Sequence, residues 1–167
     1  MDESVQAELN RAAFIGISMS VSGLDEIGDR LLVVFDGHCG FCNGWVRWLL
    51  RRDRCDRLRF AASSSEAIAP LLARHADLLD AGGAPGTVLV FRNPLEAGEQ
   101  ALTRCAATIS LLRELPQAWP VVATALSWIP RFLSDPLYRL VARWRYSIWG
   151  RLESCPIPSA EERTRFL

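Results

Sequence analysis

The sequence predicts an α/β fold, and three observations lead to that prediction. Apolar residues form continuous runs at 31–35 and 87–91, which is typical of strands buried on both faces. Between these runs lie segments in which apolar residues recur at helical spacing. Clusters of glycine and proline, such as residues 82–86, separate the segments. Half of the 167 residues are apolar and the formal net charge is zero, so nothing in the composition favours nucleic acid as a partner.

The first half of the core is predicted to run strand, helix, strand, helix. Residues 31–35 form the first strand, and residues 43–52 form a helix with Trp45, Val46 and Leu49 on one side and arginines on the other. Residues 57–60 are predicted to form a short second strand. Ser63, followed three residues later by Glu66, fits a capping box, so a second helix is expected from there to about residue 79.

The second half of the core is predicted to run strand, strand, helix. Residues 87–91 form a strand, residues 97–102 form a weaker one after a turn, and Thr103 caps a helix that ends near residue 115. The alternation predicts one right-handed parallel crossover, followed by a hairpin. This order, βαβαββα, is that of a thioredoxin-like core. Pro85 precedes the third strand, where such folds place a cis-proline facing the active site; the sequence leaves the cis and trans states open.

Two additions flank this core of residues 30–115. Residues 1–29 are expected to form a poorly ordered extension. Residues 116–167 are expected to form a helical region packed on the core, and one of its helices should begin at Ser134-Asp135-Pro136. No apolar run in it reaches the length of a membrane span. Along that helix, apolar residues recur at helical spacing and should be buried against the core: Leu137, Leu140, Val141 and Trp144.

The strongest chemical signal is the pair Cys39-x-x-Cys42, directly between the first strand and the first helix. A helix N-terminus carries a partial positive charge and unpaired N–H groups, and both favour a thiolate over a thiol. Cys39 is therefore the candidate nucleophile. Cys42, one turn later on the same face, can attack the resulting mixed disulfide and release the product.

Two other interpretations of this pair carry less weight. A structural disulfide across so short a loop would remove little entropy from the unfolded chain. A zinc site needs four ligands, usually from a second cysteine or histidine pair, and no such pair occurs. The remaining candidates are scattered single residues: His38, His75, Cys55, Cys105 and Cys155.

Two neighbours of the dithiol are candidate supporting residues. Asp36 follows the buried strand, so its carboxylate can accept the Cys42 proton when Cys42 attacks. Alternatively, Asp36 is a turn residue that binds the backbone N–H groups of Gly37 to Cys39; both roles stay open. His38 can stabilise the Cys39 thiolate when protonated, or can simply be exposed.

With these residues identified, the chain resembles the DCC family, also called DUF393, of predicted thiol-disulfide oxidoreductases. The name refers to Asp-x-x-Cys-x-x-Cys, here Asp36, Cys39 and Cys42, and the resemblance extends through Asn43. It covers roughly residues 30–167 and includes the segments 135–139, 145–146, 155–158 and 163–167. The resemblance implies a thioredoxin-like fold and disulfide exchange. It also draws attention to Cys155, either as a second resolving thiol or as a packing residue before Pro156.

We therefore predict a thiol-disulfide oxidoreductase of the protein-disulfide reductase type, in which Cys39, Cys42 and Asp36 act and His38, Gly37, Pro85 and Cys155 support them. Five cysteines with a single close pair are unlike a secreted disulfide scaffold, so a cytoplasmic location is expected. The predicted partners are a disulfide-bearing protein or small thiol and a thiol electron donor, with no cofactor, metal or nucleic acid. The alternatives are a metal-binding domain, or an accessory module whose Trp- and Arg-rich C-terminal region docks on a partner protein, a membrane enzyme or a membrane surface.

Overall fold

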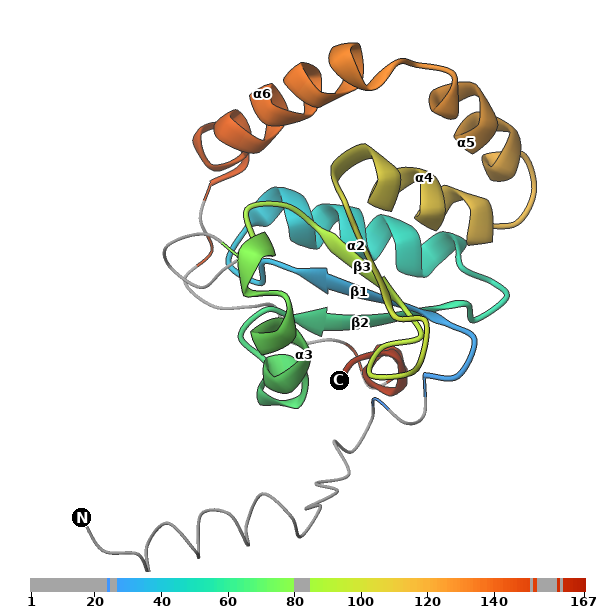
Figure 1. Cartoon of the computed structure of the whole chain (residues 1–167), viewed down its shortest axis with the longest axis vertical. Coiled ribbons are helices and arrows are strands. Elements are labelled where there is room, and N and C mark those ends of the chain that lie inside the picture. The colour runs from blue at the N-terminus through green and yellow to red at the C-terminus, as the bar shows by residue number, and fades with distance from the viewer. Residues whose placement is uncertain (1–23, 25–26, 80–84, 151, 153–158, 160) are drawn as a thin grey trace, which may run out of the picture.

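A four-stranded mixed sheet forms the centre of the computed structural model, which describes residues 24, 27–79, 85–150, 152, 159 and 161–167 (Figure 1). The expected N-terminal extension, residues 1–29, lies largely outside these described residues. The strands lie in the order β2-β1-β3-β4. β1 pairs with β2 in parallel and with β3 antiparallel, and β3 pairs with β4 antiparallel. This arrangement confirms a parallel crossover, the hairpin and the thioredoxin-like fold class. The strands are β1 (Leu31–Phe35), β2 (Leu58–Ala62), β3 (Leu89–Arg92) and β4 (Gln100–Thr103).

β1 is buried along its whole length, as its continuous apolar run predicts. Helices α2 (Gly40–Arg52) and α4 (Arg104–Glu114) cover one face of the sheet, and α3 (Ala69–Arg74) covers the other (Figure 1). Because side chains alternate along a strand, Val33 and Phe35 join the core with α2 and α4, while Val34 joins the core with α3. Two buried cores thus hold β1, and with it the loop that follows it, in a fixed position.

The capping box predicted at Ser63 is wrong. The segment begins later, at Ser65, whose side chain makes no cap hydrogen bond. The Ser63 N–H instead donates to the carbonyl oxygen of Phe35 at 2.8 Å, which keeps it with the sheet. Pro70 lacks an N–H group and is best tolerated in the first turn of a helix, which is where it lies in α3. The predicted single helix is therefore a succession of short pieces: η1 (Glu66–Ile68), α3 and η2 (Ala76–Leu78).

The third and fourth strands are correctly predicted, but both begin two or three residues later than expected. The connection between them needs more residues because Asn93, Leu95 and Gly98 all have positive φ angles of 47°, 65° and 90°. Such residues turn the chain and cannot continue a strand. Thr103 does precede α4 as predicted, although its side chain makes no cap hydrogen bond.

Two helices follow the core, α5 (Trp119–Ser127) and α6 (Arg131–Trp149). The predicted helix start at Ser134-Asp135-Pro136 is wrong, because α6 begins earlier and contains Pro136. The carbonyl oxygen of Pro130 accepts the N–H groups of Leu133 at 3.0 Å and Ser134 at 3.2 Å, which starts the helix ahead of the expected cap.

The apolar stripe of α6 is more exposed than predicted. Leu140 is 54% exposed, Val141 37% and Trp144 53%, whereas the stripe was expected to be buried. Figure 1 shows the reason: α5 and α6 arch over α2 and α4 and do not lie flat on the sheet. A ring cluster anchors the start of the arch, because Trp48 on α2 stacks on Trp45 with centroids 4.8 Å apart and contacts Trp119 edge-on at 4.7 Å.

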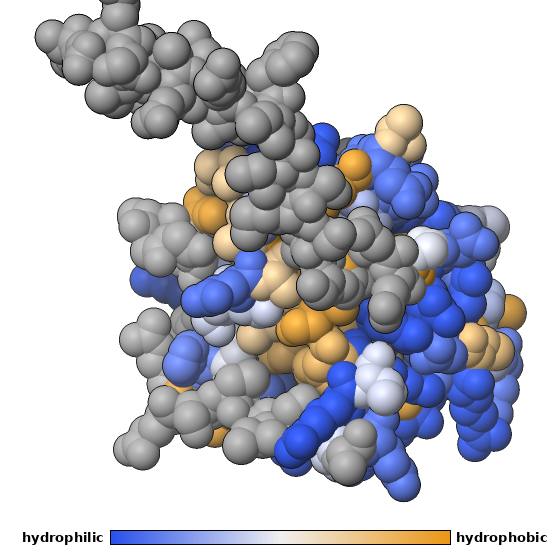
Figure 2. All heavy atoms as spheres, turned by 90° about the horizontal axis from the view of Figure 1, so that it is seen from below, coloured by the Kyte–Doolittle hydropathy of each residue, from blue (hydrophilic) through white to orange (hydrophobic). Residues whose placement is uncertain are grey.

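The C-terminal residues return to the sheet. Phe166 pairs with Phe60 beside β2, and the Leu167 N–H donates to the carbonyl oxygen of Phe60 at 3.0 Å. The Phe166 ring lies 5.6 Å from that of Phe60 and 6.3 Å from that of Phe35. Figure 2 views the molecule from the end that carries α3 and the C-terminus, where hydrophobic residues gather in the middle of the face and hydrophilic ones to one side. Residues 116–167 are thus joined to the core at both ends.

Candidate active site

The two cysteines lie at the junction between β1 and α2, where the sequence places them. Cys39 is the N-cap residue of α2, with extended backbone angles of φ −91° and ψ 116°. Its Sγ accepts the N–H of Cys42 at 3.3 Å. A sulfur atom in this position receives one of the N–H groups that the first turn of a helix leaves unpaired. The Cys39 side chain therefore caps the first turn of α2.

Both cysteines are buried in this conformation. Cys39 is 0% exposed and Cys42 is 2% exposed, so the candidate nucleophile is not accessible from the surface in this conformation. Gly150 and Leu152, which follow α6, contact the dithiol loop. The Gly150 carbonyl oxygen accepts the Gly40 N–H at 3.4 Å, and the Leu152 N–H donates to the His38 carbonyl oxygen at 2.8 Å. We call Gly150 and Leu152 the cover.

The loop before Cys39 is held by its own side chains. Asp36 is 7% exposed, and its Oδ1 accepts the His38 N–H at 2.9 Å. The Asp36 carbonyl oxygen accepts the Cys39 N–H at 3.2 Å. The turn role proposed for Asp36 is therefore present. Asn43, for which sequence reasoning gave no role, donates its side-chain N–H groups to the carbonyl oxygens of Gly37 at 2.8 Å and Cys39 at 3.0 Å. An amide in the first turn of a helix was the available signal.

The other predicted site residues differ in how close they lie to the dithiol. His38 is exposed, and its Nδ1 lies 3.3 Å from the Leu152 carbonyl oxygen, so it contacts the cover. Gly37 is buried in the loop itself. Pro85 is buried and pairs with Leu79 ahead of β3, but its bond to Ala84 lies outside the described residues, and so does Cys155. Cys55 is exposed and Cys105 is partly buried.

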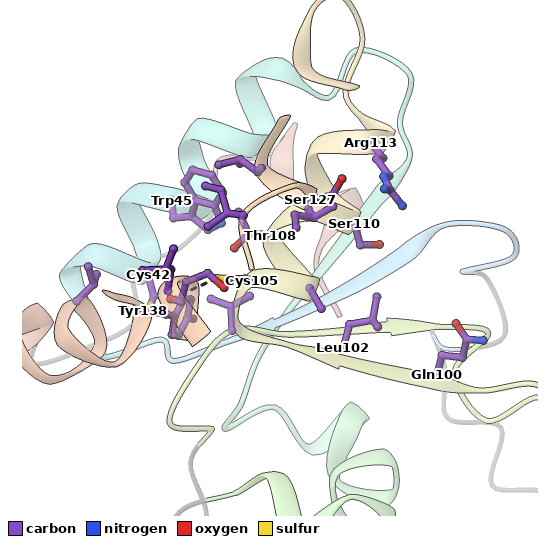
Figure 3. A pocket seen from close by; sticks show the side chains of 18 of the residues that line it. Cys42, Trp45, Gln100, Leu102, Cys105, Thr108, Ser110, Arg113, Ser127 and Tyr138 are labelled. Carbon is purple, nitrogen blue, oxygen red and sulfur yellow. Dashed lines mark hydrogen bonds between the residues drawn. The ribbon is translucent and has the colours of Figure 1, made fainter. Parts of the chain in front are cut away.

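A cavity of about 1020 Å³ adjoins the dithiol between α2, α4, α5 and α6 (Figure 3). Cys42 lines this cavity and Cys39 does not, and Cys105 and Tyr138 line it as well. Sequence reasoning missed the cavity, because its roof comes from helices far along the chain. Two contacts hold that roof near the core: the Tyr138 hydroxyl hydrogen-bonds the Thr87 hydroxyl, and Cys105 Sγ lies 3.8 Å from the Ser134 carbonyl oxygen.

Within the described residues, no three histidine, cysteine or carboxylate side chains gather as metal ligands would. In the same part of the chain, no helix combines the length and the apolar character that crossing a membrane requires.

Comparisons with known proteins agree with this geometry. A family model described as DCC1-like thiol-disulfide oxidoreductase matches residues 33–151. The chain is 32% identical over 139 residues to a chloroplastic DCC family protein of Arabidopsis thaliana, covering 81% of this chain and 74% of that protein. It is 30% identical over 146 residues to YuxK, an uncharacterized protein of Bacillus subtilis strain 168, covering 86% of this chain and 97% of that one. No solved structure shows a significant match.

Proposed function

Because the chain belongs to the DCC1-like thiol-disulfide oxidoreductase family, we propose that it exchanges disulfides through Cys39 and Cys42. The observation that carries this proposal is the position of both cysteines in the first turn of α2, with Cys39 Sγ accepting the Cys42 N–H at 3.3 Å. This contact supports a thiolate on Cys39, and the attack on a disulfide needs a thiolate.

In the proposed reaction the reduced protein gives two electrons to a disulfide. The Cys39 thiolate attacks one substrate sulfur, the substrate S–S bond breaks, and the other sulfur leaves as a thiolate that takes up a proton. Cys42 then loses its proton to Asp36, directly or through water, and attacks the Cys39 sulfur. The second thiol of the substrate leaves, and a Cys39–Cys42 disulfide remains. A thiol donor reduces it again, so the chemistry needs no cofactor.

The buried dithiol adds a condition to this scheme. Since Cys39 is 0% exposed, a protein disulfide reaches it only when the cover moves off His38 and Gly40. Three backbone and side-chain contacts hold the cover there, each of which is a single hydrogen bond worth about 1 kcal/mol. Opening the cover therefore requires only a few kcal/mol of free energy when a substrate binds. We place the activity in the cytoplasm, where thiols such as those of Cys39, Cys42 and Cys105 stay reduced.

Trapping experiments test the proposal directly. Cys42→Ser, incubated with a disulfide substrate, should accumulate a mixed disulfide on Cys39, because nothing resolves it. Cys39→Ser should accumulate none, and Cys105→Ser serves as the control that retains the dithiol. If neither variant forms a mixed disulfide and the native protein reduces no disulfide, the function is wrong. A glutathione titration of the native protein then gives its reduction potential: near ~−270 mV indicates a reductase and near ~−120 mV an oxidant.

A second candidate function rests on a separate observation. The arch of α5 and α6 exposes large apolar side chains: Val121 is 71% exposed, Trp128 83%, Phe132 74% and Ile148 59%. The sequence of α6 carries four arginines and a single carboxylate, Asp135. Exposed aromatic residues beside arginines suit an anionic membrane surface. Sedimentation with vesicles tests this: binding to vesicles with anionic lipids, but not to neutral ones, should be lost in Trp128→Ser with Phe132→Ser.

A further inference from the structure

The cavity beside the dithiol is elongated, and its two ends differ. It follows α4 from Cys105 to Arg113, both of which line it. Eight residues of helix span roughly 12 Å at 1.5 Å per residue. Figure 3 shows Cys42 and Tyr138 at one end and Arg113 and Gln100 at the other. A molecule that fills the cavity must therefore match a sulfur-bearing end and an arginine-bearing end.

Between its ends the cavity is mostly apolar, with the hydroxyl groups of Thr108 and Ser127 among its lining. Trp45 from α2 and Ile109 from α4 form its floor, and Leu126 and Leu133 come from the arch above. Its volume of about 1020 Å³ is at the upper limit for pockets that hold one small molecule. The apolar middle suits a hydrocarbon chain, which gains free energy in proportion to the apolar surface removed from water.

The charged end is positive. Arg92 and Arg113 line the cavity, and among the described residues no carboxylate side chain lines it. Arg92 is already engaged, because its guanidinium lies 3.6 Å from the Glu114 carboxylate and donates to the Ser110 hydroxyl at 3.2 Å. Arg113 makes no ion pair with any carboxylate of the described residues. An anionic head group fits this end, because an arginine next to an apolar cavity pairs well with a carboxylate.

At the other end, the cavity reaches the dithiol from the side of Cys42, where the cover does not lie. While the cover is in place, the burial of both cysteines keeps out the surface of a folded protein, whereas a narrow chain inside the cavity can bring its end to Cys42. The Cys39 Sγ accepts the Cys42 backbone N–H at 3.3 Å, so the nucleophile adjoins the residue that lines the cavity.

We propose that the substrate is a small carboxylate with an apolar chain and a disulfide at the end far from the carboxylate. Its carboxylate lies at Arg113, its chain lies between Trp45 and Leu133, and its disulfide lies at Cys42. This inference rests on the proposed function and uses the same exchange. Two electrons pass from the dithiol to the substrate disulfide, which leaves as a dithiol with both protons, and the protein keeps the Cys39–Cys42 disulfide.

Lipoate, a 1,2-dithiolane on an apolar chain that ends in a carboxylate, is the probe for this class. Its neutral amide, lipoamide, differs only at the head group. With dithiothreitol as thiol donor, kcat/KM for lipoate should exceed that for lipoamide. Arg113→Gln should lower kcat/KM for lipoate about tenfold, which is the effect of losing one charge-assisted hydrogen bond, and leave lipoamide unchanged. Arg54→Gln, at an exposed arginine that does not line the cavity, is the matched control.

Octanoate separates the inference from the proposed function, because it has the chain and the carboxylate but no sulfur. It should bind the native protein in calorimetry, compete with lipoate, and bind less tightly to Arg113→Gln. Ala106→Trp, an exposed position that lines the cavity, should block both molecules. If a small neutral disulfide is reduced but octanoate does not bind and lipoate shows no dependence on Arg113, the inference is wrong and the function stands. If octanoate binds but no disulfide is reduced, the function and the disulfide substrate are both wrong.

Discussion

At the scale of single residues, the dithiol loop shows how one side chain serves the fold and the chemistry together. Asp36 and Asn43 hold the backbone around Cys39 from opposite sides, through hydrogen bonds of 2.8 to 3.0 Å. Cys39 itself caps α2 through its sulfur. A substitution in this loop therefore changes stability and reactivity at once, and conservative variants are needed to separate the two effects.

At Asp36, two substitutions can separate the effect on stability from the effect on reactivity. Asp36→Asn keeps an oxygen that can accept the His38 N–H, whereas Asp36→Ala leaves that N–H without its partner. We expect Asp36→Ala to lose about 1 kcal/mol of unfolding free energy and Asp36→Asn to lose less. If the carboxylate takes the Cys42 proton, Asp36→Asn should still slow release of the mixed disulfide at neutral pH. Urea unfolding and stopped-flow exchange measure the two quantities; equal release rates in the native protein and Asp36→Asn would leave Asp36 with the turn role alone.

Asp56 sets a dependence of stability on acid pH. Hydrogen bonds from Arg59 at 2.8 and 2.9 Å, assisted by the charges of Arg165 and Arg30, lower the pKa of Asp56 from 3.8 to about 2. Because the folded-state pKa is the lower one, the stabilisation is complete above pH 3.8 and disappears as the pH falls to about 2. The side chain is 41% exposed, so solvent screening limits the effect to about 1 kcal/mol or less.

The variant Asp56→Asn tests this pH window. Asparagine tolerates the positive φ of 54° at this position, so the backbone should be retained. Unfolding free energies measured between pH 2 and pH 6 should differ between the native protein and the variant above pH 4 and converge toward pH 2. A difference that is constant over the whole range would mean that the carboxylate charge is not the cause.

At the scale of elements, the predictable and unpredictable parts of the chain differ in the range of the contacts that determine them. β1 is determined locally by a continuous apolar run. α2 is determined locally by its apolar face and by Arg51 and Arg52 in its last turn. The sequence therefore predicts both elements well. The piece after β2 departs from its local signal because Ser63 is held by the neighbouring strand β1. The dithiol could be located from the sequence because all its residues are adjacent. The cover could not, because Leu152 is 114 residues from His38.

The cover depends on an unusual backbone angle, which offers a way to loosen it. Gly150 follows α6 with φ +73°, a conformation that a β-branched residue adopts only with strain. Gly150→Val should therefore weaken the contacts to Gly40 and His38 and raise the rate at which iodoacetamide alkylates Cys39. Peptide mapping after timed alkylation gives this rate.

Gly44, an exposed glycine inside α2 with open space around it, supplies the control. Gly44→Ala should stabilise the protein by roughly 0.5–1 kcal/mol, because alanine suits a helix interior, and should leave the alkylation of Cys39 unchanged. If Gly150→Val does not alkylate faster than Gly44→Ala, the cover does not control access to Cys39.

At the scale of the whole molecule, the core and the C-terminal region share buried side chains. Phe166 packs on Phe35 and Phe60, and Trp119 packs on Trp48. A chain that ends before Pro116 loses both contacts, so we expect its unfolding free energy to fall by several kcal/mol, since each large apolar side chain contributes roughly 1.5–3 kcal/mol when buried. Thermal unfolding beside the full chain measures this loss. An unchanged midpoint with full activity would show that residues 116–167 form an independent docking arm.

The attachment of Phe166 and Leu167 beside β2 has a consequence for competition at the dithiol. The cover is a tethered occupant, fastened through α5 on one side and through the chain end on the other, and after each opening it is still within reach of His38. Tethering of this kind raises the effective concentration of the attached group at its site, which for short linkers reaches the millimolar range. A free peptide that binds the same loop with an intrinsic Kd in the micromolar range therefore shows a weaker apparent affinity. It has to compete with the cover, which remains attached to the same chain. A molecule that enters along α4 meets no such competitor.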